Sequence, residues 1–120
     1  MPKYMLLLHE SATLSAKMGA TMSPAEIQAL IARYKNWAGT LAAAGRLAGG
    51  DKLQDATGRV LKSSPSGLSI TDGPYVESKE VIGGYFVINA ADYDEAVALS
   101  RECPHLDFGV VELREVEPTS

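Results

Sequence analysis

The sequence predicts an α+β fold of the ferredoxin-like type, an antiparallel sheet that carries two helices on one of its faces. Apolar, strand-like segments at residues 4–9, 81–89 and 110–116 and helix starts at Ser23 and Asp92 predict it. With a short edge strand after the first helix, the elements follow the order βαββαβ, and a β-hairpin is inserted into this order.

Length and composition indicate one globular domain over residues 1–120. The chain is 46% hydrophobic and 22% charged, which is ordinary for a soluble domain with a core. A net charge of −4 and scattered basic residues argue against a nucleic-acid partner, since phosphate binding needs a concentrated basic surface. The single cysteine, Cys103, excludes an intrachain disulfide and a thiolate metal cage. The apolar run of residues 4–8 is too short for a signal peptide or a membrane span, so we expect a cytoplasmic protein without a membrane partner.

The first strand is predicted over residues 4–9. Tyr4-Met5-Leu6-Leu7-Leu8 is a continuous apolar run, typical of a central strand, and His9 follows near its end. Residues 10–21 are rich in Ser, Ala, Thr and Gly and predict a long loop.

A long helix is predicted from Ser23 to a stop at Gly45. Ser23 is an N-cap, Pro24 suits the first helical position, and Glu26 completes a capping box. Trp37 lies at the edge of the apolar stripe of this helix. The stripe itself consists of Ile27, Leu30, Ile31, Tyr34, Ala38 and Leu41.

A short or irregular edge strand and a β-hairpin are predicted next. The edge strand falls in residues 46–55, where Gly49 and Gly50 weaken it. The segments 59–62 and 68–71 flank Ser64-Pro65-Ser66-Gly67, which indicates a hairpin with a longer loop.

The stretch from Thr71 to Asn89 organises the rest of the chain. Asp72-Gly73-Pro74 is a turn signal, because Asp bonds nearby backbone, Gly tolerates positive φ and Pro fixes φ. The strand predicted over residues 81–89 has two adjacent glycines near its start, Gly83 and Gly84, which predict a bulge or the close approach of another backbone or a ligand.

The last helix and strand complete the pattern. A second capping box at Asp92 and Glu95 begins a helix that Pro104 closes, with Ala96, Val97, Ser100 and Cys103 on one face. The final strand covers residues 110–116. Because both helices lie on one face of the sheet, the other face would expose apolar side chains, and we expect a homodimer of the α/β-barrel-like kind to cover it.

Several segments together resemble a known family. They are Tyr4-Met5-Leu6-Leu7, Ser23-Pro24, residues 71–80 with Asp72-Gly73-Pro74-Tyr75, Gly83-Gly84-Tyr85-Phe86-Val87-Ile88, the helix ending at Cys103-Pro104, and Val111-Glu112-Leu113-Arg114. The chain resembles the YCII-related superfamily over nearly its whole length and, within it, the DGPF-domain branch. Tyr75 stands where the branch has Phe, and Ser78 stands where Thr is usual.

This resemblance implies a ferredoxin-like fold and a dimer with facing sheets, similar to muconolactone isomerases. Some YCII-like proteins resemble lyases or isomerases of hydroxylated aromatic breakdown products, with a proposed His–Asp pair. The DGPF branch often accompanies extracytoplasmic-function sigma factors. The family's proposed His lies just after the Pro that opens the first helix, and the matching position, counted from Pro24, holds Glu26.

His9 and Asp72 are the candidate catalytic residues. An imidazole moves protons near neutral pH, and a carboxylate within reach would orient it or act as a base. The alternatives are a histidine that caps the strand end and an aspartate that holds its own turn. For Glu26 the capping box is a simpler explanation than replacement of the family's histidine.

The candidate substrate-binding residues would serve a small anionic or aromatic ligand. Lys79 and Glu77 would bind charge or shuttle a proton, although exposed loop charges are usually only solvated. At Gly83 and Gly84 a ligand would approach the bare backbone, and the alternative is a bulge. Tyr34 and Trp37 would form apolar walls of a pocket, and the alternative is packing in the core. No metal-ligand spacing and no phosphate-binding glycine loop occurs, so we expect neither a metal nor a cofactor.

Three classes of function stay open at this point. The first is a lyase or isomerase that works by proton transfer with His9 and Asp72 in one cleft. The second is a non-catalytic ligand-binding or regulatory dimer, associated with an extracytoplasmic-function sigma factor. The third is a purely structural dimer. An apolar cleft that holds both residues would favour the enzyme.

Overall fold

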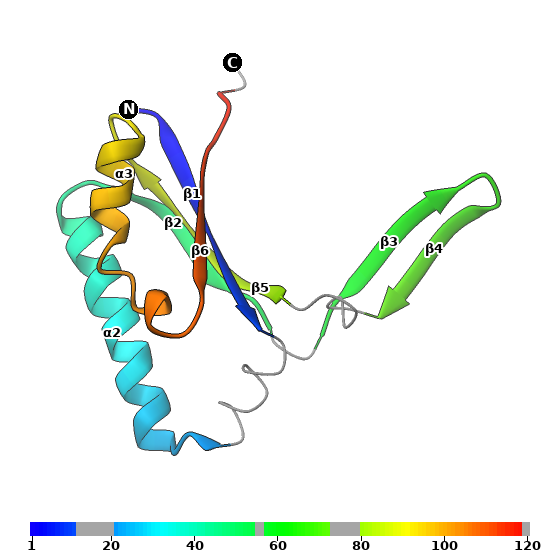
Figure 1. Cartoon of the computed structure of the whole chain (residues 1–120), viewed down its shortest axis with the longest axis horizontal. Helices are drawn as coiled ribbons and strands as arrows, with labels where there is room; N and C mark the ends of the chain where they lie inside the picture. The colour runs from blue at the N-terminus through cyan, green and yellow to red at the C-terminus, as the bar shows by residue number, and fades with distance from the viewer. Residues whose placement is uncertain (12–20, 55–56, 73–79, 119–120) are drawn as a thin grey trace.

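The computed structural model describes residues 1–11, 21–54, 57–72 and 80–118 (Figure 1). A four-stranded sheet has the order β2-β5-β1-β6, and every neighbouring pair is antiparallel. Its strands are β1 (Lys3–Ser11), β2 (Leu47–Lys52), β5 (Glu80–Asn89) and β6 (Val110–Glu115). This mixed α+β arrangement is compatible with the predicted ferredoxin-like fold, with the first strand at its centre.

Two helices cover one face of the sheet (Figure 1). Helix α2 (Pro24–Ala43) begins with the predicted capping box: the Ser23 hydroxyl accepts from the Glu26 amide, and the Glu26 carboxylate accepts from the Ser23 amide. Helix α3 (Tyr93–Ser100) is shorter than predicted and is followed by the 3₁₀ helix η1 (Pro104–Asp107).

The second predicted capping box is present only in part. The Asp92 carboxylate accepts from the Glu95 amide, as expected for an N-cap. The Glu95 carboxylate, however, bonds the Ala91 amide at 3.0 Å and pairs with Arg46. Glu95 therefore ties α3 to the residue that precedes β2, a long-range role that the local motif does not reveal.

The hydrophobic core lies between the sheet and the helices. Trp37 is one of its central residues: its ring meets Phe86 edge-on at 4.9 Å, and its indole N–H donates to the Leu99 carbonyl at 3.2 Å. The buried apolar side chains are Tyr4, Leu6, Leu8, Trp37, Leu41, Ile88, Ala90, Ala96 and Cys103.

The predicted apolar faces of the two helices are only partly buried. In α2, Ile27 and Ile31 are 39% and 48% exposed, because the sheet covers the second half of the helix better than the first. In α3, Val97 is also exposed, whereas Ala96 and Ser100 are buried. Trp37, expected at the edge of the stripe, is at its centre.

The predicted hairpin is present as a separate two-stranded sheet. Strand β3 (Arg59–Ser64) pairs with β4 (Gly67–Asp72) in antiparallel register, and the hairpin projects away from the four-stranded sheet (Figure 1). Ser64 pairs with Gly67, so the connection is a two-residue turn and not the longer loop expected from the sequence.

The predicted bulge at the paired glycines is present. Leu8 pairs with Gly84 and His9 with Ile82, so Gly83 is the extra residue of β5. A Cβ at Gly84 would lie 3.0 Å from the Asp51 carbonyl oxygen of β2, which explains the need for glycine at this close approach. The backbone that approaches Gly84 closely is thus that of the neighbouring strand β2.

Candidate functional site

His9 lies between two carboxylates at the end of β1. Its Nε2 is 2.8 Å from Oε1 of Glu112, and its Nδ1 is 3.7 Å from Oε2 of Glu80. Only the first distance is that of a hydrogen bond. The His9 side chain is 21% exposed and both carboxylates are more exposed, so the cluster is open to small molecules.

The cluster lies on the face of the sheet that no helix covers. Glu112 alternates along β6 with Val111 and Leu113, which pack against the core, so its side chain points to the other face. His9 meets it there, directly beside the bulge at Gly83. Bulges often re-aim a side chain next to a functional site, and this one follows the last core residue of β1, Leu8.

His105, for which the sequence predicts no role, binds the backbone of β1 at His9. It is buried, and its Nε2 lies 2.7 Å from the His9 carbonyl oxygen, while its Nδ1 lies 3.2 Å from the Tyr34 hydroxyl. Nε2–H therefore donates to the carbonyl and Nδ1 accepts from the phenol. Burial raises the pKa of Tyr34, which keeps the donating proton on its oxygen.

Tyr34 and Trp37 lie beneath the sheet, on the helical side. Tyr34 is half-buried, stacks against Phe86 with ring centroids 6.5 Å apart, and hydrogen-bonds His105. Trp37 is buried in the core. We expected these rings to form the walls of a pocket around the His9 imidazole. In the structure the imidazole instead contacts carboxylates on the opposite face of the sheet.

Asp72 ends the hairpin and pairs with Arg59 across it at 3.4 Å. Among the residues that the structure describes, no hydrogen bond or ion pair joins Asp72 to His9. Glu77 and Lys79 lie outside the described residues, and their role in ligand binding stays a prediction. The described contacts thus give His9 a different carboxylate partner, Glu112, from the one expected.

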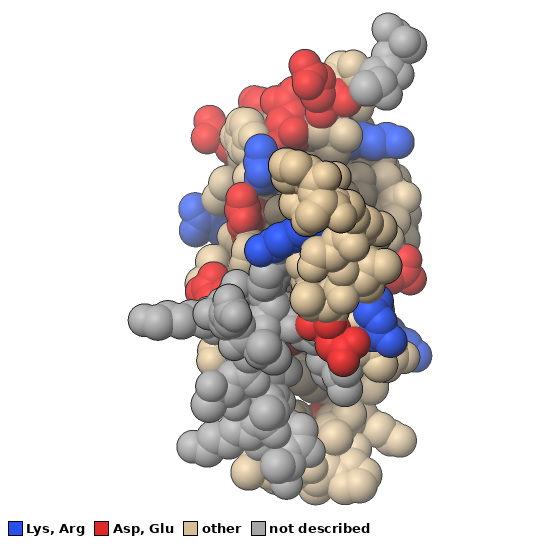
Figure 2. All heavy atoms as spheres, turned by 90° about the vertical axis from the view of Figure 1, so that its right-hand side faces the viewer, with Lys and Arg blue, Asp and Glu red and all other residues tan. Residues whose placement is uncertain are grey.

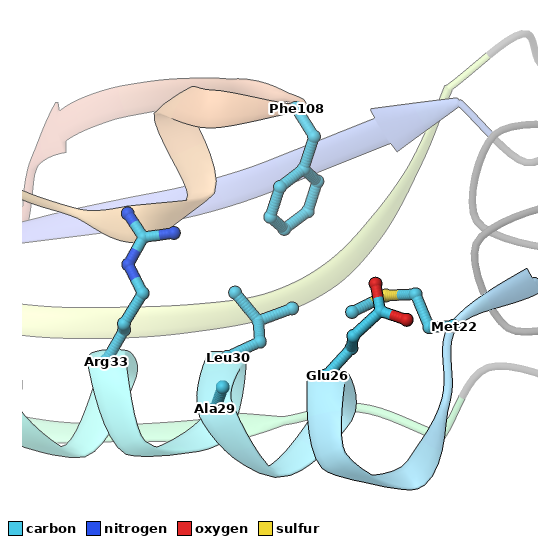
Figure 3. A pocket seen from close by; sticks show the side chains of 6 residues that line it. All are labelled: Met22, Glu26, Ala29, Leu30, Arg33 and Phe108. Atoms are coloured by element: carbon cyan, nitrogen blue, oxygen red, sulfur yellow. The ribbon is translucent and has the colours of Figure 1, made fainter.

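A shallow apolar groove of about 340 Å³ lies between α2 and the turn after η1 (Figure 3). Phe108 points from this turn toward Leu30 of α2, with Arg33 at one end of the groove and Glu26 and Met22 at the other. Arg33 is held by Asp107 at 2.7 Å, and Glu26 by its capping box. Glu26 therefore borders the groove while its carboxylate caps the helix.

Charge on the described surface is mixed. In Figure 2, which looks from the side on which the hairpin projects, uncharged side chains make up much of the described face, and Lys and Arg do not gather in one patch. Within residues 1–11, 21–54, 57–72 and 80–118, no group of three or more metal-ligating side chains is placed to hold an ion. No helix in the same ranges is long and apolar enough to span a membrane.

The comparison with protein families identifies the chain. A comparison with curated proteins finds no match. The family model described as YCII-related domain matches residues 3–120, a range that includes the His9 cluster, the groove and the hairpin. The chain therefore belongs to the YCII-related family.

Proposed function

We propose that this YCII-related domain is a small-molecule enzyme of the lyase or isomerase type, in which His9 transfers a proton. The observation that carries the proposal is the position of the imidazole, 2.8 Å from Glu112, 3.7 Å from Glu80 and partly open to solvent. A histidine oriented by a carboxylate is a common arrangement for general acid–base catalysis. Hydroxylated aromatic compounds, the class implied by the family resemblance, are the proposed substrates.

The tautomer of His9 defines its role. When Nε2–H donates to the Glu112 carboxylate, Nδ1 keeps a free lone pair. Nδ1 then takes a proton from the substrate as general base and returns it to another atom of the substrate as general acid. Glu80 does not hydrogen-bond Nδ1 at 3.7 Å, but its charge stabilises the imidazolium formed between the two steps. Glu112 thus takes the orienting role first expected of Asp72.

Proton transfer is tested by solvent exchange. The protein is incubated in D₂O with a panel of hydroxylated aromatic compounds, and deuterium incorporation and product formation are followed by NMR. His9→Gln is expected to lower the rate about 10²–10⁴-fold, the usual contribution of a general acid–base group. Glu112→Gln keeps the ring position but removes the charge and should lower the rate less. Glu102→Gln, which changes an exposed carboxylate in the turn that follows α3, is the matched control and should leave the rate unchanged.

A non-catalytic ligand-binding role is the second candidate, and the apolar groove favours it. Its volume lies at the lower end of the range for small-molecule pockets, and Phe108 offers a ring for stacking. The link to an extracytoplasmic-function sigma factor rests on the family resemblance. A thermal-shift screen with the same compounds separates the two roles: stabilisation that Phe108→Ala abolishes, without deuterium exchange or product, would favour the binding module.

A further inference from the structure

A chain of two hydrogen bonds reaches His9 from the helical side of the sheet. The Tyr34 hydroxyl lies 3.2 Å from His105 Nδ1, and His105 Nε2 lies 2.7 Å from the His9 carbonyl oxygen. His105 is 3% exposed, so water competes little for either bond. The chain ends on the backbone of the proposed catalytic residue, whereas the imidazole of that residue lies on the opposite face.

The bulge in β5 explains why the backbone of His9 uses such a partner. The pairing of β1 with β5 shifts between Leu8 and His9, where Gly83 is the extra residue. The Gly83 carbonyl accepts from the Leu53 amide, beyond the end of β2. A bulge disrupts the ladder locally. The ladder on this side therefore holds His9 less firmly than it holds Leu8, and His105 supplies a fixed partner.

A fixed carbonyl also fixes the direction of the imidazole. Each residue has only two soft backbone dihedrals, and the orientation of the His9 carbonyl relative to its Cα sets one of them, ψ. On the other face of the sheet, His9 Nε2 lies 2.8 Å from Glu112 Oε1. Because a separation of about 3.6 Å is no longer a hydrogen bond, a shift of about 0.8 Å would break this contact. The alignment of His9 with Glu112 thus depends on the backbone that His105 holds.

Tyr34 keeps His105 in the form that can hold this carbonyl. Nε2 donates only while it carries the proton, and a phenol that donates to Nδ1 favours that tautomer and that ring orientation. The rings are packed as well: Phe108 meets the His105 ring edge-on at 4.9 Å, and Phe86 stacks on Tyr34. His105 is thus held by contacts at both of its nitrogens and on its ring.

We propose that His105 is a positioning residue for His9. It holds the backbone so that the imidazole stays aligned with Glu112 for proton transfer, and Tyr34 supports it at the second nitrogen. The proposal rests on the proposed function, since alignment affects a rate only if His9 reacts. A misplacement of about 1 Å can lower a rate about 10²-fold. His105 reaches His9 through the carbonyl and not through the imidazole, so its loss should lower kcat and leave KM nearly unchanged.

Two substitutions at position 105 test the proposal in the D₂O exchange assay, at a temperature at which circular dichroism shows each variant folded. His105→Leu removes the donor and should lower kcat about 10–100-fold with KM changed less than about twofold. His105→Gln retains an N–H near the place of Nε2 and should restore most of the rate. In a His9→Gln background, His105→Leu should cause no further loss, since the group that it positions is absent. Equal losses in both backgrounds, or equal losses with Leu and Gln, would overturn the proposal.

Tyr34→Phe is the milder variant if His105→Leu folds poorly. It keeps the stacking on Phe86 and removes only the hydroxyl that holds His105 Nδ1. It should lower kcat about 3–10-fold, the effect of one hydrogen bond, and this loss should also vanish in the His9→Gln background. Tyr93→Phe, which removes a phenol that bonds the backbone of β6, is the matched control and should leave the rate unchanged. A rate lowered equally by the two changes would refute the positioning role.

NMR of the imidazoles separates this proposal from the proposed function. His105→Leu leaves His9 as the only histidine of the chain, so its ¹⁵N signals are assigned directly. The His9 Nε2–H proton should exchange with water at least about tenfold faster than in the native protein, because its bond to Glu112 is loosened, and His105→Gln should restore the native rate. These changes without turnover of any compound by the native protein would contradict the proposed function and support the positioning. An unchanged exchange rate in His105→Leu would refute the positioning, whether or not the protein is active.

Discussion

Gly109→Ala should destabilise the protein strongly, because this glycine lies where the turn after η1 comes close to β1. A Cβ built on Gly109 would lie 2.4 Å from His105 Nε2 and 2.5 Å from the His9 carbonyl oxygen. These are the two atoms of the 2.7 Å hydrogen bond that joins His105 to β1. One of them belongs to the backbone of a central strand, so the clash cannot be relieved by rotating a flexible side chain.

The magnitude follows from two effects. Forcing a methyl group into a packed site costs about 1–3 kcal/mol through shifts of backbone and side chains. If His105 moves to make room, its buried N–H loses the His9 carbonyl, and an unsatisfied buried group costs about another 1–3 kcal/mol. The free energy of unfolding should therefore fall by about 2–6 kcal/mol, a large part of the 5–15 kcal/mol typical of a domain.

Urea unfolding followed by circular dichroism measures this loss. Gly39→Ala is the matched control, because Gly39 lies in α2 with nothing within 4 Å of the added Cβ, and it should stabilise the protein by about 0.5–1 kcal/mol. A lower free energy of unfolding for Gly109→Ala and a higher one for Gly39→Ala would support the close contact of Gly109 with His105 and β1. A Gly109→Ala variant within about 0.5 kcal/mol of the native protein would refute the reasoning, since surface changes alone fall in that range.

Three further outcomes are expected. Gly84→Val should lower the free energy of unfolding by about 1–3 kcal/mol, because its side chain meets the Asp51 carbonyl of β2, and a neutral result in urea would contradict the close approach. Tyr34→Phe removes the donor to His105 Nδ1 and should cost about 1–3 kcal/mol, and an unchanged unfolding midpoint would argue against that bond. Burial raises the pKa of the Cys103 thiol above its unfolded value of 9.0, so the stability linked to it is complete below pH 9 and is lost as pH rises toward the folded pKa. Melting curves between pH 8 and about pH 11 should thus show a weaker alkaline loss in Cys103→Ala, and identical slopes would speak against this linkage.

Local sequence signals predicted the elements well, because their causes are local. The Ser23 and Glu26 capping box marks the start of α2 correctly, and the two glycines of β5 mark a bulge. The same kind of signal was misleading at Glu95, where a long-range partner, Arg46, takes the carboxylate. The order of elements was sufficient to predict the antiparallel sheet with β1 at its centre.

The contacts of the candidate site depend on register and packing, which a single sequence does not encode in any short pattern. His9 and Glu112 are 103 residues apart, and they meet only because β6 pairs with β1 in one register. His105 follows a proline in an ordinary turn sequence, and it is buried where η1 packs against α2 and β6, with its Nε2 on the His9 carbonyl of β1. A histidine beside a glycine-containing turn offers no local sign of such a role.

The sequence left two roles open for His9, proton transfer and structural support of the strand end. His105 takes the structural role. His105 satisfies the backbone of β1 from within the protein, where Tyr34 holds it, so the strand end does not need the His9 imidazole for its stability. Glu80 and Glu112 are 55% and 44% exposed and return to water when that imidazole is removed. An exposed ion pair contributes only about 0–1 kcal/mol, so His9→Gln should lower the melting temperature by less than about 5 °C. A large loss of proton transfer with so small a loss of stability is the combination that only a chemical role for His9 explains, because a structural histidine would show the reverse.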